Sequence, residues 1–145
     1  SSPGGIRCPD ANKTINDQIF KGTLLINYNG HGNTERLAHE NILSSPDYLT
    51  WKNEYKMPFM ITATCEFSRF DNPLQPSAGE FTFLNAKGGA TSMITTTREI
   101  FISTGQLFNK NLIKKLLGMM KIHIAMAVCV QEAQEVLECI MMKIV

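Results

Sequence analysis

Three short apolar runs, alternating with segments of helical character, constrain the fold of this chain more than any other feature. Each run has the length of a buried strand and is bounded by turn-forming residues. The third is also rich in β-branched residues. The runs are TLLINY (23–28), PFMITATC (58–65) and ATSMITTT (90–97). Their alternation with helices predicts an α/β fold, with a mostly parallel sheet flanked by helices.

Helix signals lie before, between and after these runs. Ile15 and Ile19 stand one helical turn apart and share a face of the first helix. Ser77 and Glu80 form a capping-box pattern at the start of another. The predicted helices cover residues 10–22, 36–43, 78–86 and 104–117.

The chain of 145 residues is long enough for one domain with its own core. Three strands are few against the usual five or six, and the opening SSPGG resembles an interior loop. We therefore expect part of a larger domain. Residues 1–118 form the predicted domain, and residues 119–145 form a tail that contains no glycine, proline or aromatic residue.

The tail admits two hypotheses. Its apolar residues fit one face of a terminal amphipathic helix; they are Ala133, Val136, Leu137, Ile140 and Ile144. A frameshift is the other explanation, because glycine codons read one base late give valine, alanine, glutamate and aspartate. Translation of the coding DNA in the other two frames tests it.

Composition narrows the classes of function. The 14 basic and 13 acidic residues give a net charge of +1 and are scattered, so no nucleic-acid partner is expected. No apolar run approaches the roughly 18 residues of a membrane helix, and no signal peptide is visible. Four cysteines without a CxxC pair exclude zinc-finger spacing. Dinucleotide, P-loop and GxSxG patterns are absent.

A histidine and a cysteine follow the first two predicted strands. His31 and Cys65 lie 34 residues (65 − 31) apart, which is about one strand–crossover–strand unit. Chemistry gathers at the carboxyl ends of parallel strands. If the two strands are neighbours, His31 can activate the Cys65 thiol as a nucleophile.

Glycines beside the histidine strengthen this interpretation. Gly30 allows a sharp turn after the strand. Gly32 allows a substrate carbonyl to approach the backbone, and its N–H can point at a developing oxyanion. The N–H of Cys65 is the second predicted donor. Such donors contribute roughly 3–4 kcal/mol each in acyl-transfer sites.

Other interpretations remain open from the residues alone. A cysteine at the end of an apolar strand is often a small core residue, and a histidine in a glycine-rich loop is often a surface residue. A metal-dependent hydrolase would draw on His31, His39, Glu40 and Cys65, although HExxH is absent because no second histidine follows His39-Glu40. No metal and no cofactor are expected in the leading hypothesis.

Blocks around both residues resemble a known family. NYNGHG after one strand and ITATCEF after the next are similar to the histidine and cysteine blocks of caspase-like cysteine peptidases. Within that clan the chain resembles the gingipain family, and most fully the PorU-type sortases of the type IX secretion system. The similar segments lie in order between about residues 6 and 117.

The resemblance implies a caspase-like fold, of which this chain holds the C-terminal part, and names site residues. By this resemblance, His31 and Cys65 are expected to be the catalytic pair, and Gly32 is expected to help form the oxyanion hole. Four further residues are candidates for the substrate pocket: Glu66, Thr96, Thr97 and Arg98. The catalytic acid of gingipains lies upstream of the matched segments. Where Cys8 stands the family usually has an aromatic residue, so Cys8 is expected to be neither catalytic nor bridged.

The resemblance also implies a setting. It predicts an extracellular or cell-surface endopeptidase or transpeptidase that acts on exported cargo proteins beside outer-membrane components of the secretion system. A rival hypothesis from another class is a non-catalytic fragment or scaffold piece of a secretion-associated protein.

Overall fold

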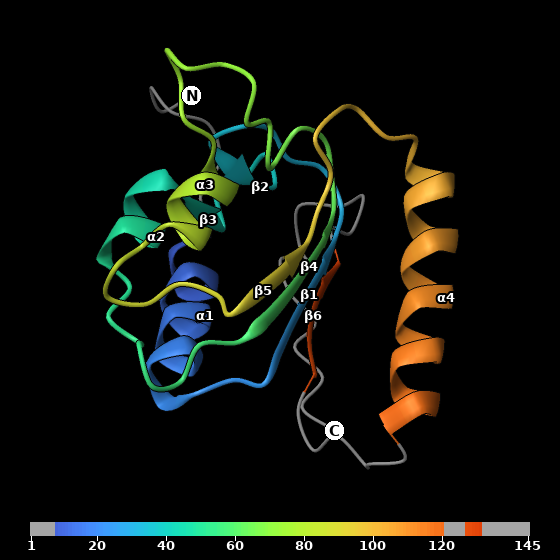
Figure 1. Cartoon of the computed structure of the whole chain (residues 1–145), viewed down its shortest axis with the longest axis horizontal. Helices are drawn as coiled ribbons and strands as arrows, with labels where there is room; N and C mark the ends of the chain where they lie inside the picture. The colour runs from blue at the N-terminus through green and yellow to red at the C-terminus, as the bar shows by residue number, and fades with distance from the viewer. Residues whose placement is uncertain (1–7, 121–126, 132–145) are drawn as a thin grey trace.

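A parallel sheet organises the chain, as the sequence predicts. The computed structural model describes residues 8–120 and 127–131. Its main sheet has the strand order β5-β4-β1-β6, and each neighbouring pair is parallel (Figure 1). The strands are β1 (Leu25–Asn29), β4 (Phe59–Ala63), β5 (Ser92–Ile94) and β6 (Ala127–Gln131). The helices are α1 (Pro9–Lys21), α2 (Ser45–Thr50), α3 (Ala78–Phe83) and α4 (Ile102–Met120).

The core lies between the sheet and α1, α2 and α3, which cover one face of it (Figure 1). The predicted pair Ile15 and Ile19 of α1 is almost completely buried. Tyr48 and Trp51 meet edge to face at a ring-centroid distance of 5.0 Å, and both are fully buried. Burial of such large rings supplies much of the hydrophobic stabilisation of a small domain.

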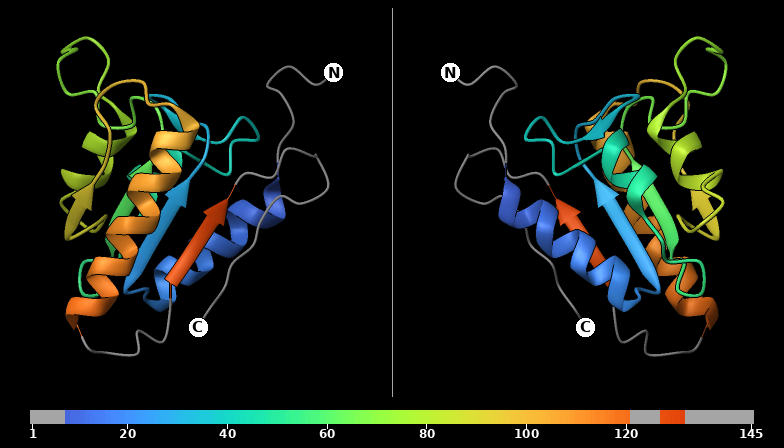
Figure 2. Two further views of the ribbon diagram at one scale, coloured as in Figure 1. Left: turned by 90° about the vertical axis from the view of Figure 1, so that its right-hand side faces the viewer. Right: turned by 90° about the vertical axis from the view of Figure 1, so that its left-hand side faces the viewer.

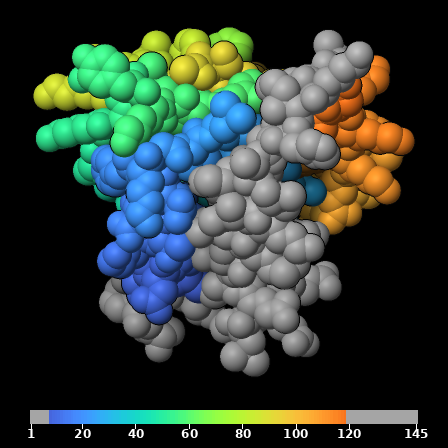
Figure 3. All heavy atoms as spheres, turned by 90° about the horizontal axis from the view of Figure 1, so that it is seen from below, coloured from blue at the N-terminus to red at the C-terminus, as the bar shows by residue number. Residues whose placement is uncertain are grey.

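The long helix α4 covers the opposite face of the sheet (Figures 1 and 2). Seen from below, α1 and α4 lie on opposite sides of the molecule (Figure 3). Two buried amides join α4 to the sheet: Asn27 Nδ2 donates to Asn109 Oδ1 at 3.1 Å, and Asn109 Nδ2 donates to Asn27 Oδ1 at 2.8 Å. At Gly105 the helix approaches Ala63 closely enough for an added Cβ to reach ordinary contact, 3.7 Å.

The prediction of a helix over residues 36–43 is wrong. Strands β2 (Arg36–Leu37) and β3 (Leu43–Ser44) form an antiparallel pair there instead. Ala38 and Asn41 between them adopt positive φ values of 61° and 51°, which a right-handed helix does not allow. The hairpin buries Leu37 and Leu43 to 1% exposure, so tertiary packing overrides the helical spacing.

Part of the tail is described. Helix α4 continues past Gly118 to Met120, and residues 127–131 form β6 beside β1. The predicted amphipathic helix, from Ala133 to Ile144, lies outside the described residues.

Candidate active site

The carboxyl ends of β1 and β4 lie side by side, and they determine how far along the strand direction His31 and Cys65 lie. Asn29 pairs with Ala63 at the last position of the parallel register, and the Gly30 N–H donates to the Ala63 carbonyl at 3.4 Å. His31 and Cys65 each follow two residues later. Their separation of 34 residues equals the register offset, so they follow adjacent strands at the same level. The expectation that these two strands are neighbours is confirmed.

The backbone of His31 is held firmly, while its side chain is exposed. Its carbonyl accepts the N–H of Ala38 at 2.8 Å and the hydroxyl of the buried Tyr28. The imidazole lies against His39, with the ring centroids 5.1 Å apart and the planes tilted by 42°. The hairpin that replaced the predicted helix therefore supplies two neighbours of His31.

Gly32 forms an isolated antiparallel bridge with Leu37. Two hydrogen bonds flank this bridge. The His31 carbonyl accepts the N–H of Ala38, and the Asn33 N–H donates to the Arg36 carbonyl at 3.1 Å. In such a pair the central residue directs its own N–H away from the opposite strand. The Gly32 N–H consequently points away from Leu37, and it makes no hydrogen bond to the described part of the chain.

A close approach explains the glycine at position 32. A Cβ built there lies 2.5 Å from Thr64 Oγ1 and 3.0 Å from the Arg36 carbonyl. The Thr64 hydroxyl is buried and has no hydrogen-bond partner among the described residues. At Gly30, by contrast, φ is not positive, since within residues 8–120 and 127–131 the glycines with positive φ are Gly22 and Gly89.

The candidate nucleophile is half-buried. Cys65 Sγ lies 3.7 Å from the carbonyl oxygen of Ile100, to which the thiol donates. The Cys65 N–H, like that of Gly32, makes no hydrogen bond within the described residues. Among the cysteines the structure describes, Cys65 is free and Cys8 is disulfide-bonded, so the expectation that Cys8 is unbridged is wrong.

The segment after Cys65 is tied to the segment after β5, where the other candidates lie. Glu66 has a φ of 52°, and its N–H donates to the Arg98 carbonyl at 3.2 Å. Ser68 N–H donates to the Thr96 carbonyl at 3.0 Å. The Thr96 hydroxyl donates to the Thr64 carbonyl, beside the nucleophile. These bonds hold the main chain on both sides of Cys65.

Charged side chains form a small network over the same two segments. The Arg69 guanidinium lies 3.0 Å from the Glu66 carboxylate and 3.4 Å from that of Asp71. Arg98 makes a two-pronged pair with Asp71, and its hydrogen bonds lower the pKa of this carboxyl. Glu66 and Arg98, both predicted as pocket residues, are therefore engaged in ion pairs, Glu66 with Arg69 and Arg98 with Asp71. Thr97 and Arg98 are exposed.

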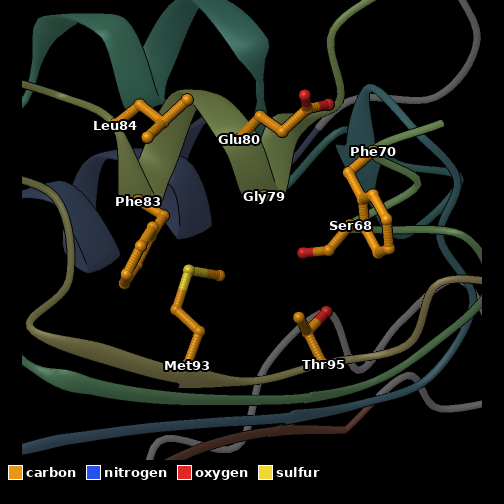
Figure 4. A pocket seen from close by; sticks show the side chains of 8 residues that line it. All are labelled: Ser68, Phe70, Gly79, Glu80, Phe83, Leu84, Met93 and Thr95. Carbon is orange, nitrogen blue, oxygen red and sulfur yellow. The ribbon is translucent and has the colours of Figure 1, made fainter. Parts of the chain in front are cut away.

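A largely apolar cavity of about 370 Å³ lies between α3 and β5 (Figure 4). Its lining residues are Ser68, Phe70, Gly79, Glu80, Phe83, Leu84, Met93 and Thr95. The predicted pocket residues are not among them, but Thr95 directly precedes Thr96, and Ser68 lies two residues after Glu66.

The alternative metal set is not assembled. His31 and His39 meet, but within the described residues no group of three or more His, Cys, Asp or Glu side chains is placed to hold an ion. None of the described helices is long and apolar enough to cross a membrane.

Sequence reasoning missed two residues of this site. Tyr28 and Thr64 are buried at the ends of β1 and β4, and both are polar residues within runs otherwise predicted as buried strand. A buried hydroxyl normally has a hydrogen-bond partner. A hydroxyl-bearing side chain within a predicted buried strand was therefore the sequence signal that could have identified these two residues.

Comparison with known proteins places this chain in a family. Residues 1–139 match the model of peptidase family C25, so the match continues beyond residue 118, the predicted domain boundary. The chain belongs to peptidase family C25.

Two solved structures share the caspase-like α/β fold. One is the Arg-specific cysteine proteinase gingipain R, at 21% identity, a TM-score of 0.59 and coverage of 79% of this chain. The other is a complex of the pro- and mature domains of Porphyromonas gingivalis RgpB, at 22% identity, a TM-score of 0.57 and coverage of 77%. The chain spans 27% and 26% of the lengths of these structures. No match is found among curated proteins.

Proposed function

We propose that this chain carries the catalytic pair of a cysteine peptidase, with Cys65 as nucleophile and His31 as its base. One observation carries the proposal: the register of β1 and β4 brings both residues to the same level of adjacent strand ends. Membership of family C25 supports the same reaction class.

In the proposed reaction, His31 accepts the thiol proton and the Cys65 sulfur attacks a peptide carbonyl. A tetrahedral intermediate forms, and its oxyanion accepts the N–H groups of Gly32 and Cys65. Collapse of this intermediate breaks the C–N bond, and the amine leaves with a proton from the imidazolium. The resulting thioester is resolved by water or by a second amine.

The two unbonded N–H groups support the oxyanion assignment. Backbone N–H groups are rarely left without a partner in a folded protein unless solvent or a ligand satisfies them. Here the N–H groups of Gly32 and Cys65 belong to the loops of adjacent strands, and neither has an acceptor within the described residues.

Labelling with a thiol-directed acyl probe tests the proposal. We expect one rapidly labelled site in the wild-type chain, and loss of that rapid phase in both Cys65→Ala and His31→Ala. Any other free cysteine remains in Cys65→Ala, so its residual labelling measures non-specific thiol reactivity. Equal labelling of the wild type and Cys65→Ala contradicts the proposal.

More specifically, the proposed enzyme is a sortase-like transpeptidase that processes proteins exported by a type IX secretion system at the cell surface. It rests on the resemblance of the NYNGHG and ITATCEF blocks, with exported polypeptides as substrates and outer-membrane secretion components as partners. Product analysis in the presence of an added amine tests it. An amide product supports transpeptidation, whereas hydrolysis alone favours an endopeptidase.

A non-catalytic scaffold is the second candidate. It is favoured by the direction of the Cys65 thiol, which donates to the Ile100 carbonyl rather than to an imidazole. A folded chain whose Cys65 reacts no faster than a free cysteine supports this candidate.

A further inference from the structure

We propose that Tyr28 is a positioning residue that aims the Gly32 N–H at the oxyanion; the inference rests on the proposed function. Tyr28 is fully buried in β1, and its hydroxyl donates to the carbonyl of His31. That carbonyl and the Gly32 N–H are two ends of one peptide group. Because a trans peptide is planar, its N–H points opposite to its C=O.

The His31 carbonyl is held by two donors, one from each side of the loop. Tyr28 precedes the loop, and Ala38, whose N–H lies 2.8 Å from the carbonyl oxygen, follows it in the β2–β3 hairpin. Two donors satisfy both lone pairs of a carbonyl oxygen. The plane of the 31–32 peptide is thereby fixed, with the Gly32 N–H directed away from the hairpin.

The chemistry of a buried phenol suits this role. A buried tyrosine hydroxyl needs a hydrogen-bond partner, and here the partner is main chain that the sheet has already positioned. A hydrogen bond to a carbonyl also polarises its peptide group, so the N–H at the other end becomes a better donor. Burial raises the pKa of the neighbouring Tyr48, so the Tyr48 phenol stays protonated and uncharged beside Tyr28.

The consequence concerns transition-state stabilisation rather than the nucleophile. Loss of the Tyr28 hydroxyl leaves the His31 carbonyl with the Ala38 N–H as its one remaining donor of the two, so the 31–32 peptide can tilt and its contact with an oxyanion weakens. The thiol and the imidazole keep their positions on the two strand ends. Steps that form a tetrahedral intermediate therefore slow, whereas a direct displacement by the thiolate does not.

Two reagents separate these steps in Tyr28→Phe, which keeps the ring and removes only the hydroxyl. Acylation by p-nitrophenyl acetate passes through an oxyanion, and alkylation by iodoacetamide does not. We expect about 10-fold slower acylation, against 100-fold or more for complete loss of an oxyanion donor, and unchanged alkylation. Tyr55→Phe is the matched control, because Tyr55 is 92% exposed.

The outcomes distinguish a failure of the inference about Tyr28 from a failure of the proposed function. Unchanged acylation in Tyr28→Phe overturns the inference, and so does equal slowing of both reactions, because that places the effect on the thiol. If His31→Ala alkylates as fast as the wild type, the proposed function fails instead.

A second measurement serves if Tyr28→Phe does not fold. In the wild-type chain, the Gly32 amide resonance should move downfield when a peptide aldehyde forms a thiohemiacetal with Cys65. No movement on formation of the adduct refutes the inference, and with it the assignment of the Gly32 N–H to the oxyanion, whereas formation of the adduct itself keeps Cys65 as the nucleophile.

Discussion

Substitution of Gly32 by alanine tests the packing beneath the candidate oxyanion hole. A Cβ at this position would lie 2.5 Å from Thr64 Oγ1, 3.3 Å from Thr64 Cγ2 and 3.0 Å from the Arg36 carbonyl. Two of these three contacts come from one side chain. Overpacking of this kind typically lowers the free energy of unfolding by 1–3 kcal/mol, and we expect about 2 kcal/mol for Gly32→Ala.

Thr64→Ala removes the obstruction at little cost of its own. The substitution deletes a buried methyl group, which costs about 1 kcal/mol. It also deletes a buried hydroxyl that has no partner among the described residues, which returns about 1 kcal/mol. In a Thr64→Ala background, Gly32→Ala keeps one of these three contacts, that with the Arg36 carbonyl, and should cost about 1 kcal/mol.

Urea denaturation of the four chains in this double-mutant cycle measures the coupling. Trp51 is the single tryptophan and is fully buried, so its fluorescence reports unfolding. We expect a coupling energy of about 1 kcal/mol between the two positions. A Gly32→Ala cost that is the same in both backgrounds would refute the reasoning, since the Thr64 side chain would then not be the obstruction.

Three further predictions concern stability. Asn109→Leu leaves the Asn27 amide buried and unpaired and should cost about 2 kcal/mol, of which the double substitution with Asn27→Leu recovers at least half in urea titrations. Tyr48→Phe deletes a buried hydroxyl without a partner in the described chain and should add about 1 kcal/mol at pH 7. Burial raises the pKa of Tyr48, so wild-type stability is full below about pH 10, the unfolded pKa, and falls above it; melts from pH 8 to 11 should show a smaller fall in the variant. Ser77→Ala removes the cap of α3 and should cost about 1 kcal/mol by thermal melting, with Ser103→Ala on the exposed side of α4 as a neutral control.

Local signals were sufficient for most of the main sheet. The runs at 58–65 and 90–97 each contain an observed strand, the run at 23–28 covers all but the last residue of β1, and the capping box at Ser77 opens α3 as predicted. These features depend on residues close together in the chain, where turn chemistry and strand length agree. The box at Ser44 carried the same signal for α2, but the adjacent turn residues obscured it.

Non-local pairing explains what the sequence did not reveal. Strand β6 pairs with β1 about 100 residues away, and no local pattern in the tail specifies that partner. Likewise, the 36–43 segment has helix-compatible spacing, yet Leu37 pairs with Gly32 and the chain turns back on itself. The adjacency of β1 and β4 was predictable because one crossover separates them. The contacts of Tyr28 and Thr64 were not, since they depend on where a hydroxyl points.

The hydrogen bonds around the candidate site are unevenly distributed, and this supports preorganisation. Gly30 donates its N–H to the carbonyl of Ala63 at the end of β4, and Glu66 and Ser68 donate theirs to carbonyls of the segment after β5. Gly32 and Cys65 stand among these donors, and their N–H groups make no bond within the described chain. The bonded neighbours fix the main chain on both sides of this pair. Donors held in this way need no reorganisation when charge develops on a substrate oxygen, which is the physical basis of oxyanion stabilisation.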